Sequence, residues 1–378
     1  MEAYELIIRG GRVIDPKNAR DEIADVAVQN GKIAAVGDLS GALAGTDVDA
    51  GGCIVTPGLI DSHAHIAPLS AIGVPADAFC FPSGVTTVND AGSAGSANYE
   101  LLRPGLMYSW VGKRIFLHVC PSGLAGFRAQ LENIDPADFD LPALRRLKEK
   151  YPEEIAGLKI RVGKETNRDL GFAPLRRAKE IAAELQLPLM VHCTDPALSM
   201  AEILSCLGKG DIITHPYHGH GRTLMEEGGF DALAAARERG VYLDVGDAGR
   251  HISFDVMRAA IQKNLWPDTI STDATERGFY NKRTTFSLPF CVSKWLNQGM
   301  PLQNAIACVT KNAARMLGME ENAGALSVGM PGDIAVFSVE NQPMIFRDGV
   351  GNALEGEQVL HPRLTVKNGG IVYRDILF

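Results

Sequence analysis

The stretch Pro57-Gly58-Leu59-Ile60-Asp61-Ser62-His63-Ala64-His65 decides the fold, because a short apolar run ends in two histidines separated by one residue. Residues two apart in a strand point to the same side. Both imidazoles therefore face one way and can hold one metal ion. Asp61 lies on that same side and could orient a histidine or contact the ion. We interpret the stretch as a buried strand that ends in a metal site.

Four further apolar runs end in a metal-ligand side chain, in the order lysine, histidine, histidine, aspartate. They are Gly157-Leu158-Lys159, Met190-Val191-His192, Ile213-Thr214-His215 and Ile270-Ser271-Thr272-Asp273. Side chains at the ends of successive parallel strands converge on one point in a closed barrel. The segment 214–220 offers three histidines, and we favour His215 because it lies nearest the strand end. The expected metal site is His63, His65, Lys159, His192, His215 and Asp273.

The middle of the chain alternates strand and helix patterns. Apolar runs predict strands near residues 54–60, 85–89, 115–119, 155–160, 188–191, 211–214, 241–245 and 269–272. Amphipathic spacing predicts intervening helices, among them 174–185, 230–239 and 256–265. This pattern predicts an α/β protein with a (β/α)8 TIM barrel, whose active site lies at the carboxyl ends of its strands. A doubly wound open sheet is the alternative, but it would not gather these ligands so easily.

Both ends of the chain indicate β structure. Short strand patterns near 5–8, 25–29 and 32–36 are separated by turn signals such as Asn30-Gly31, and similar patterns recur after residue 333. We predict one small β-sandwich formed from residues 1–53 and 326–378. The metal-dependent hydrolase barrel is expected to span residues 54–325.

Composition limits the classes of partner. The chain has 378 residues, 46% of them apolar, and a net charge of −8, which suits a barrel-sized domain with a smaller second one. The acidic balance disfavours nucleic acid and anionic membranes as partners. No N-terminal targeting signal and no apolar run of about 18 residues is found. We expect a cytoplasmic homo-oligomer that acts on a small-molecule substrate.

The lysine and the aspartate carry the chemistry. Lys159 lies inside an apolar strand, where an unpaired ammonium is costly. Reaction with CO₂ would give a carbamate that can bridge two cations; a lysine that reaches out to a glutamate is the alternative. Asp273 can take a proton from a metal-bound water and deliver it to a leaving group, although an aspartate here could also cap the next helix. We expect Asp273 to be catalytic.

Substrate contacts are expected in the loops that follow the strands. An arginine there could bind a substrate carboxylate, although a solvated arginine is the default. The substrate-binding candidates are Tyr217, His218, Arg222, Arg250, His251 and Arg277. His118 and His361 are interpreted as structural.

These motifs resemble the amidohydrolase superfamily over nearly the whole chain. The segment 329–334 resembles the one that re-enters its β-sandwich, and 83–95 is similar to a dihydroorotase-like branch of deacetylases and esterases that includes acetyl-mandelate hydrolases. The resemblance implies two divalent metal ions, usually Zn²⁺, bridged by carboxylated Lys159 and a hydroxide. It also implies that His63, His65 and Asp273 bind the more buried ion and that His192 and His215 bind the other.

The resemblance implies hydrolysis of an amide or ester bond in a small acylated acid, by attack of the metal-bridging hydroxide. A cyclic amide hydrolase of the dihydroorotase or hydantoinase type is the alternative, and a non-catalytic scaffold is a third reading. Members of the branch often carry Gly-His-Gly after strand seven, where this chain has Gly246-Asp247-Ala248-Gly249. This departure leaves the expected metal ligands intact but removes a guide to the substrate.

Overall fold

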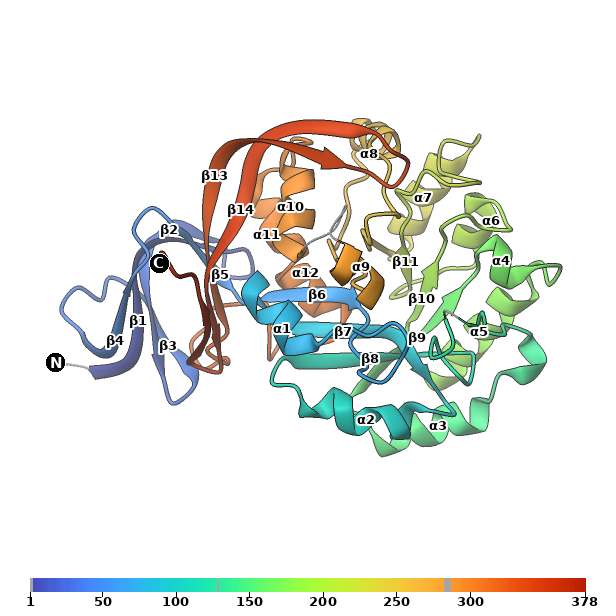
Figure 1. The fold of residues 1–378 in the computed structure, drawn as a ribbon, viewed down its shortest axis with the longest axis horizontal. Helices are drawn as coiled ribbons and strands as arrows, with labels where there is room; N and C mark the ends of the chain where they lie inside the picture. The colour runs from blue at the N-terminus through green and yellow to red at the C-terminus, as the bar shows by residue number, and fades with distance from the viewer. Residues whose placement is uncertain (1–2, 128, 282–286) are drawn as a thin grey trace.

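The computed structural model describes residues 3–127, 129–281 and 287–378 (Figure 1). Their strands form two sheets, one of eight strands and one of seven. In Figure 1 much of the eight-stranded sheet lies at the left, where both chain termini are found, and part of it reaches across the top of the view; the other sheet lies among the helices.

The eight-stranded sheet joins both ends of the chain. Its strands are β1 (Ala3–Asp15), β2 (Arg20–Gln29), β3 (Lys32–Gly37), β4 (Leu43–Asp49), β5 (Ile54–Pro57), β13 (Ile334–Arg347), β14 (Ala353–Lys367) and β15 (Gly370–Arg374). Buried apolar residues from both ends, such as Val26 and Val336, share one core. Asn30 and Gly31 both have positive φ, as a two-residue hairpin turn requires. The β-sandwich expected from both termini is confirmed.

The seven-stranded parallel sheet forms the barrel wall in sequence order. Its strands are β6 (Leu59–Ala64), β7 (Val85–Gly95), β8 (Gly112–His118), β9 (Ile155–Arg161), β10 (Leu189–His192), β11 (Ile212–Thr214) and β12 (Tyr242–Asp244). The segment after β12 closes the barrel through isolated bridges from Thr269 to Asp244 and from Ala274 to Ala64. The TIM-barrel prediction is confirmed, but the eighth strand expected at 269–272 is reduced to these bridges. Asp273, at φ 47°, turns the backbone out of an extended path there.

The strand expected at 54–60 is divided between the two sheets. β5 pairs with β1 and β13, whereas β6 pairs with β7. The chain crosses at Gly58, where an added Cβ would lie 2.2 Å from Oγ1 of Thr86. Only glycine fits this approach without displacing β7. The division into domains at residues 53 and 326 stays a prediction.

Helices surround the barrel sheet, and residues such as Ala313 of one of them pack against Ile60 and Met190 of the barrel strands. The longer helices are α2 (Tyr99–Tyr108), α3 (Leu141–Lys150), α5 (Ala173–Leu185), α7 (Gly229–Glu238), α8 (Phe254–Gln262), α10 (Leu288–Leu296) and α11 (Leu302–Cys308). The shorter ones are α1 (Ala76–Cys80), η1 (Phe81–Ser83), η2 (Pro136–Asp138), α4 (Lys164–Asn167), α6 (Met200–Ser205), α9 (Glu276–Asn281) and α12 (Lys311–Met316). α5 buries Leu175, Ala178 and Ile181 on the predicted face. Within the described ranges, no helix combines the length and the apolarity that a membrane crossing needs.

Candidate metal centre at the barrel mouth

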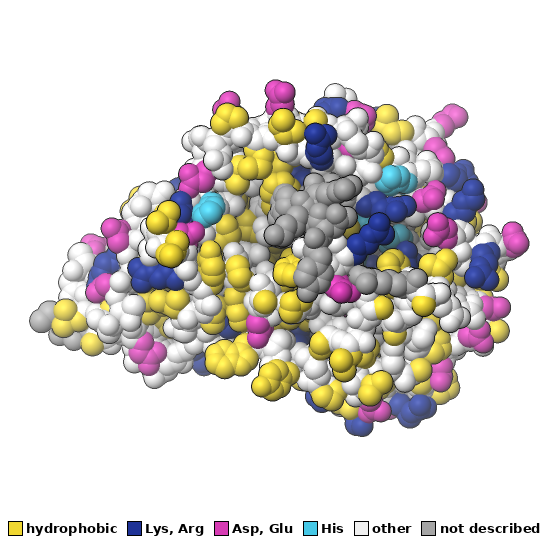
Figure 2. Space-filling model, in the orientation of Figure 1, with side chains coloured by type: hydrophobic (Ala, Val, Ile, Leu, Met, Phe, Trp, Pro, Cys, Tyr) yellow, Lys and Arg dark blue, Asp and Glu magenta, His cyan; other side chains and the backbone are white. Residues whose placement is uncertain are grey.

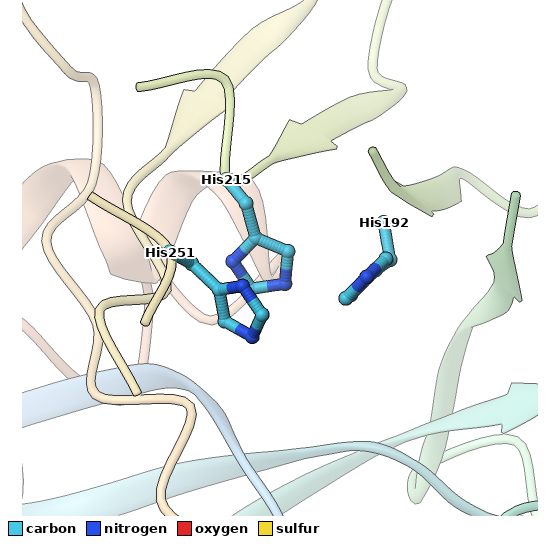
Figure 3. A group of neighbouring side chains, drawn as sticks. All are labelled: His192, His215 and His251. Carbon is cyan, nitrogen blue, oxygen red and sulfur yellow. The ribbon is translucent and has the colours of Figure 1, made fainter. Parts of the chain in front are cut away.

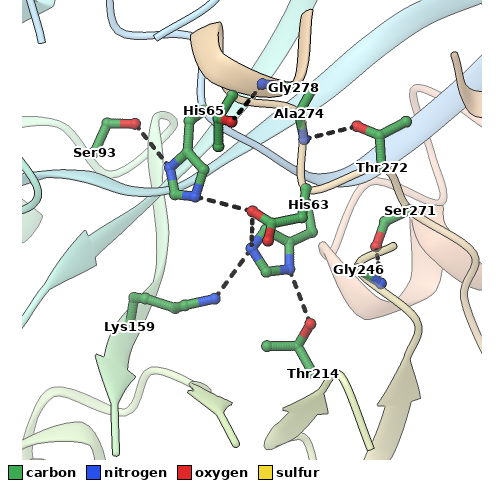
Figure 4. Close-up of polar contacts among 12 residues, drawn as sticks. His63, His65, Ser93, Lys159, Thr214, Gly246, Ser271, Thr272, Ala274 and Gly278 are labelled. Carbon is green, nitrogen blue, oxygen red and sulfur yellow. Dashed lines mark hydrogen bonds and ion pairs between the residues drawn. The ribbon is translucent and has the colours of Figure 1, made fainter. Parts of the chain in front are cut away.

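His63 lies at the carboxyl end of β6 and His65 follows the last residue of that strand, and Figure 4 shows Ser93 beside His65 and Thr214 beside His63. Nε2 of His63 lies 3.3 Å, and Nε2 of His65 3.2 Å, from the same oxygen, Oδ1 of Asp273. Nδ1 of His65 lies 3.0 Å from the hydroxyl of Ser93. Nδ1 of His63 lies 2.9 Å from the hydroxyl of Thr214, so each ring is held at one nitrogen and presents the other to the site.

Asp273 is the centre of the cluster. Its second oxygen, Oδ2, lies 3.3 Å from Nε2 of His251 and 3.8 Å from Nε2 of His215. Burial acts to raise the pKa of Asp273, but the neighbouring imidazoles of His63, His251 and His65 outweigh it and hold that pKa well below its usual value. The carboxylate is therefore anionic.

Asp61 fixes the backbone that carries Asp273. Its carboxylate accepts hydrogen bonds from the backbone nitrogen of Thr272 at 3.0 Å and from the Thr272 hydroxyl at 2.6 Å. Burial raises the pKa of Asp61 to about 7 despite these bonds. Asp61 thus acts on the segment that carries Asp273.

Lys159, at the carboxyl end of β9, is almost fully buried beside the histidines. Its Nζ lies 3.1 Å from Nε2 of His63 and 3.3 Å from the sulfur of Met190. Among the described residues no carboxylate lies within ion-pair distance of Nζ, so the alternative of a lysine paired with a glutamate is wrong there. Burial lowers the pKa of Lys159 to about 8.

Three further histidines form the other half of the site (Figure 3). The ring centroids of His192 and His215 lie 4.6 Å apart, and those of His215 and His251 lie 4.2 Å apart. Burial lowers the pKa of all three imidazoles. His251, expected to contact substrate, therefore lies within the cluster itself.

His215 carries the strongest sign of a metal. Its Nδ1 lies 2.8 Å from the carbonyl oxygen of Gly246 and must donate to it. Nε2 of the neutral ring is then a bare lone pair, and it is buried with no hydrogen-bond partner among the described residues. A buried lone pair beside a carboxylate is favourable only when a cation lies between them.

The donor atoms fit one or more divalent ions. The ligand atoms of His192, His215 and His251 lie within 4.8 Å of one another, as do those of His63, His215 and Asp273. Neutral imidazole and carboxylate are the donors that zinc and similar ions take. The residues expected to form one site are thus brought together, and His251 joins them.

Two of the other substrate candidates are buried. Tyr217 is fully buried, its hydroxyl donates to the carbonyl oxygen of Leu265 at 3.1 Å, and its ring packs on Trp295. It does not join the cluster, and its contacts are those of a core residue. His218 is also buried; burial lowers its pKa to about 3, and its Nε2 has no partner within the described part of the chain.

The three arginine candidates lie at the surface. Arg222 is about half exposed and pairs with Glu226 at 3.1 Å, whereas Arg250 and Arg277 are exposed. On the barrel half of the face seen in Figure 2, lysine or arginine side chains gather beside histidine side chains. Among the described residues, no hydrogen bond or ion pair joins these three arginines to the histidine cluster, although burial and, more weakly, the charge of Arg250 act to lower the pKa of the neighbouring His251.

Sequence reasoning missed Asp244 and Arg161. Asp244, at the end of β12, accepts hydrogen bonds from the hydroxyls of Ser271 and Thr214, each at 2.7 Å, and lies beside His63. Arg161 follows Lys159 by two residues on β9. Asp244 could have been found as an acidic residue at the end of a buried strand. Arg161 could have been found because residues two apart on a strand share one face, which places it on the face of Lys159.

Comparison with known proteins agrees with this geometry. Residues 54–356 match the model of the Amidohydrolase family. A deacetylase of Agrobacterium fabrum is 33% identical over 357 residues, which cover 93% of this chain and 87% of that protein. A deacetylase of Enterococcus faecalis is 27% identical, covering 97% and 99%. A dihydroorotase crystal structure superposes with a TM-score of 0.90 at 30% identity, covering 98% of this chain and 99% of that one.

The chain therefore belongs to the amidohydrolase family, and it is a hydrolase. An adenine deaminase crystal structure also superposes, with a TM-score of 0.89 at 26% identity over 98% of this chain and all of the other. Relatives with this fold thus carry different activities, so the substrate has to be argued from the site.

Proposed function

We propose that this hydrolase is a binuclear metal-dependent enzyme that cleaves an amide or ester bond in a small acylated acid, as a deacetylase or esterase. The observation that carries the proposal is the bare, buried Nε2 of His215 in a cluster of histidines around the Asp273 carboxylate. Curated relatives named deacetylases, which match 93% and 97% of this chain, support the choice of reaction.

The ligand assignment follows the two halves of the cluster. His63, His65 and Asp273 would hold one ion, and His192 and His215 would hold the other. The imidazole of His251 lies close enough to His192 and His215 to bind that second ion as well. Nζ of Lys159 lies 3.1 Å from Nε2 of His63, so the carbamate of this lysine would be a further ligand of the metal. We propose Zn²⁺ as the metal, because imidazole-rich sites of this kind suit it.

When bound, the two ions supply Lewis acidity toward water and toward the scissile carbonyl. Asp273 provides the proton path. Its carboxylate, held anionic by the imidazoles of His63, His251 and His65, accepts the proton of the attacking water and returns it to the departing nitrogen or oxygen. Asp61 holds this carboxylate in place through Thr272.

The direct test combines metal analysis with a substrate panel. Protein purified without chelator should contain close to two equivalents of metal per chain and should hydrolyse at least one N-acetyl or O-acetyl acid, and chelation should abolish the activity. A protein that takes up no metal even on reconstitution would support the non-catalytic scaffold instead.

A second candidate is a cyclic amide hydrolase, which the similarity to the dihydroorotase structure favours. Assays with dihydroorotate and hydantoin separate the two, because a cyclic amide hydrolase turns these over faster than any acyclic acid. A cytoplasmic homo-oligomer stays our prediction, and light scattering of the purified protein measures its assembly state.

A further inference from the structure

Arg161 stands beside the metal cluster without belonging to it. It ends β9, and the parallel pairing of β9 with β10 places Arg161 opposite His192 and Lys159 opposite Met190. Residues two apart on a strand share one face, so Arg161 projects on the same side of the barrel as Lys159. The guanidinium therefore lies at the inner side of the barrel mouth, one strand from a proposed ligand.

The loop after β8 holds this arginine in one orientation. Both oxygens of Glu132 approach a single guanidinium nitrogen, Nη1, at 2.9 and 3.1 Å. The Glu132 side chain is completely buried, and the guanidinium carbon lies 5.0 Å from the ring centre of Phe127. The buried carboxylate and the aromatic ring fix the orientation of the guanidinium but do not use all of its N–H donors.

One edge of the guanidinium is left available. In the part of the chain that the structure describes, no hydrogen bond engages Nε or Nη2 of Arg161. The exposed fraction of the Arg161 side chain is 18%. A guanidinium edge with two parallel N–H groups matches a carboxylate.

His118 offers a second donor on the neighbouring strand. It pairs with Lys159 in the register of β8 and β9, and its Nδ1 accepts the backbone N–H of Cys120 at 3.0 Å. The ring is therefore neutral, and Nε2 carries its single proton. That N–H is buried and has no partner among the described residues, so it lacks an acceptor.

We propose that Arg161 and His118 form an anion-binding subsite that receives the carboxylate of the substrate, making Arg161 the residue that selects acids. The inference rests on the proposed function for the identity of the substrate, and it replaces Arg222, Arg250 and Arg277 in that role. Those three lie at the surface, where solvent weakens an ion pair.

The test compares each acid with its carboxamide. Metal-loaded wild-type protein and the R161M variant are titrated calorimetrically with a panel of short N-acetyl amino acids and O-acetyl 2-hydroxy acids, and with the matching carboxamides. We expect R161M to weaken binding and raise KM for the acids by tenfold or more, with the carboxamides unchanged. R161K, which keeps the charge but loses the planar fork, should show an intermediate loss for the acids alone.

H118N and R145M complete the design. Asparagine can still accept a hydrogen bond from the Cys120 N–H but lacks the Nε2 donor. H118N should therefore weaken the binding of the acids and leave the binding of the carboxamides unchanged. Arg145 pairs with Glu184 on the outer surface, and R145M should change nothing. Equal loss for acids and carboxamides in R161M, or wild-type protein that binds no acid more tightly than its carboxamide, overturns the subsite. Selective acid binding without hydrolysis of any panel member instead overturns the proposed function and leaves the subsite standing.

Discussion

Oδ2 of Asp244 lies 3.2 Å from Nδ1 of His63, although the two residues are 181 positions apart in the chain. Asp244 ends β12, His63 lies on β6, and the hydroxyl of Thr214 lies 2.9 Å from the same Nδ1. A carboxylate that holds the far nitrogen of a ligand histidine sets its tautomer and makes the near nitrogen a better donor. Asp244 is fully buried, so this arrangement is protected from water.

The D244N substitution should therefore weaken metal binding about 10–100-fold while the barrel still folds. Competition with a chromophoric chelator measures the affinity. D211N is the matched control, because Asp211 is another buried aspartate that pairs with Lys179 away from the cluster. We expect D211N to reduce stability only; equal metal affinity in D244N and wild type would refute the role of Asp244.

The D273N variant should retain metal and lose about 10²–10⁴-fold in kcat, because the amide cannot accept the proton of the attacking water. Steady-state kinetics and elemental analysis on the same sample separate the two effects. D255N serves as the control, since Asp255 is exposed and pairs with Arg258 on α8. Full activity in D273N would exclude the proton-transfer role.

Metal loading should depend on bicarbonate through Lys159. Burial lowers the pKa of this lysine to about 8, so near pH 8 about half of it is the free amine that reacts with CO₂. Reconstitution of stripped protein in CO₂-depleted buffer should leave metal content low, and added bicarbonate should restore it. K159R should bind less metal with or without bicarbonate; a wild-type protein that is indifferent to bicarbonate argues against the carbamate.

The Y217F variant tests the placement of a residue that sequence reasoning had put in the substrate site. Its hydroxyl donates to the backbone carbonyl of Leu265, and its removal leaves a buried acceptor unpaired. We expect a loss of about 1–2 kcal/mol in the free energy of unfolding, measured with urea, and an unchanged KM. A raised KM at unchanged stability would return Tyr217 to the substrate site.

Glu154 should make stability depend on pH. Burial acts to raise its pKa, but hydrogen bonds from Arg103 at 2.8 Å and Tyr99 at 2.6 Å outweigh it, so the folded-state pKa is lowered. The stabilisation is therefore present above the unfolded-state pKa and is lost as the pH falls through the folded-state value. We expect E154Q to lower the free energy of unfolding by about 1 kcal/mol at pH 7, because the carboxylate is partly exposed, and by less below pH 4. Parallel curves of unfolding free energy against pH for wild type and E154Q, from pH 7 to 3, would refute this.

Periodicity in the sequence was enough to predict the barrel, whereas the assignment of the clustered residues as metal ligands stays a prediction. Alternation along a strand fixes which side chains share a face, so His63, His65 and Lys159 could be assigned to the barrel mouth before the structure was known. The hairpin at Asn30 and Gly31 could be predicted for a similar reason, because few residues adopt the backbone that the turn needs.

Only the tertiary structure decided which residues beyond the strand ends join the site. His251 enters the cluster and Tyr217 turns into the core because the loops leave the strands through unusual backbone conformations, as at His215 with φ 70° and Ala248 with φ 45°. The partnerships of Asp244 with His63 and of Glu132 with Arg161 depend on packing between distant segments. The pattern of one strand determines its own faces, whereas the direction of a loop depends on the other segments that pack against it.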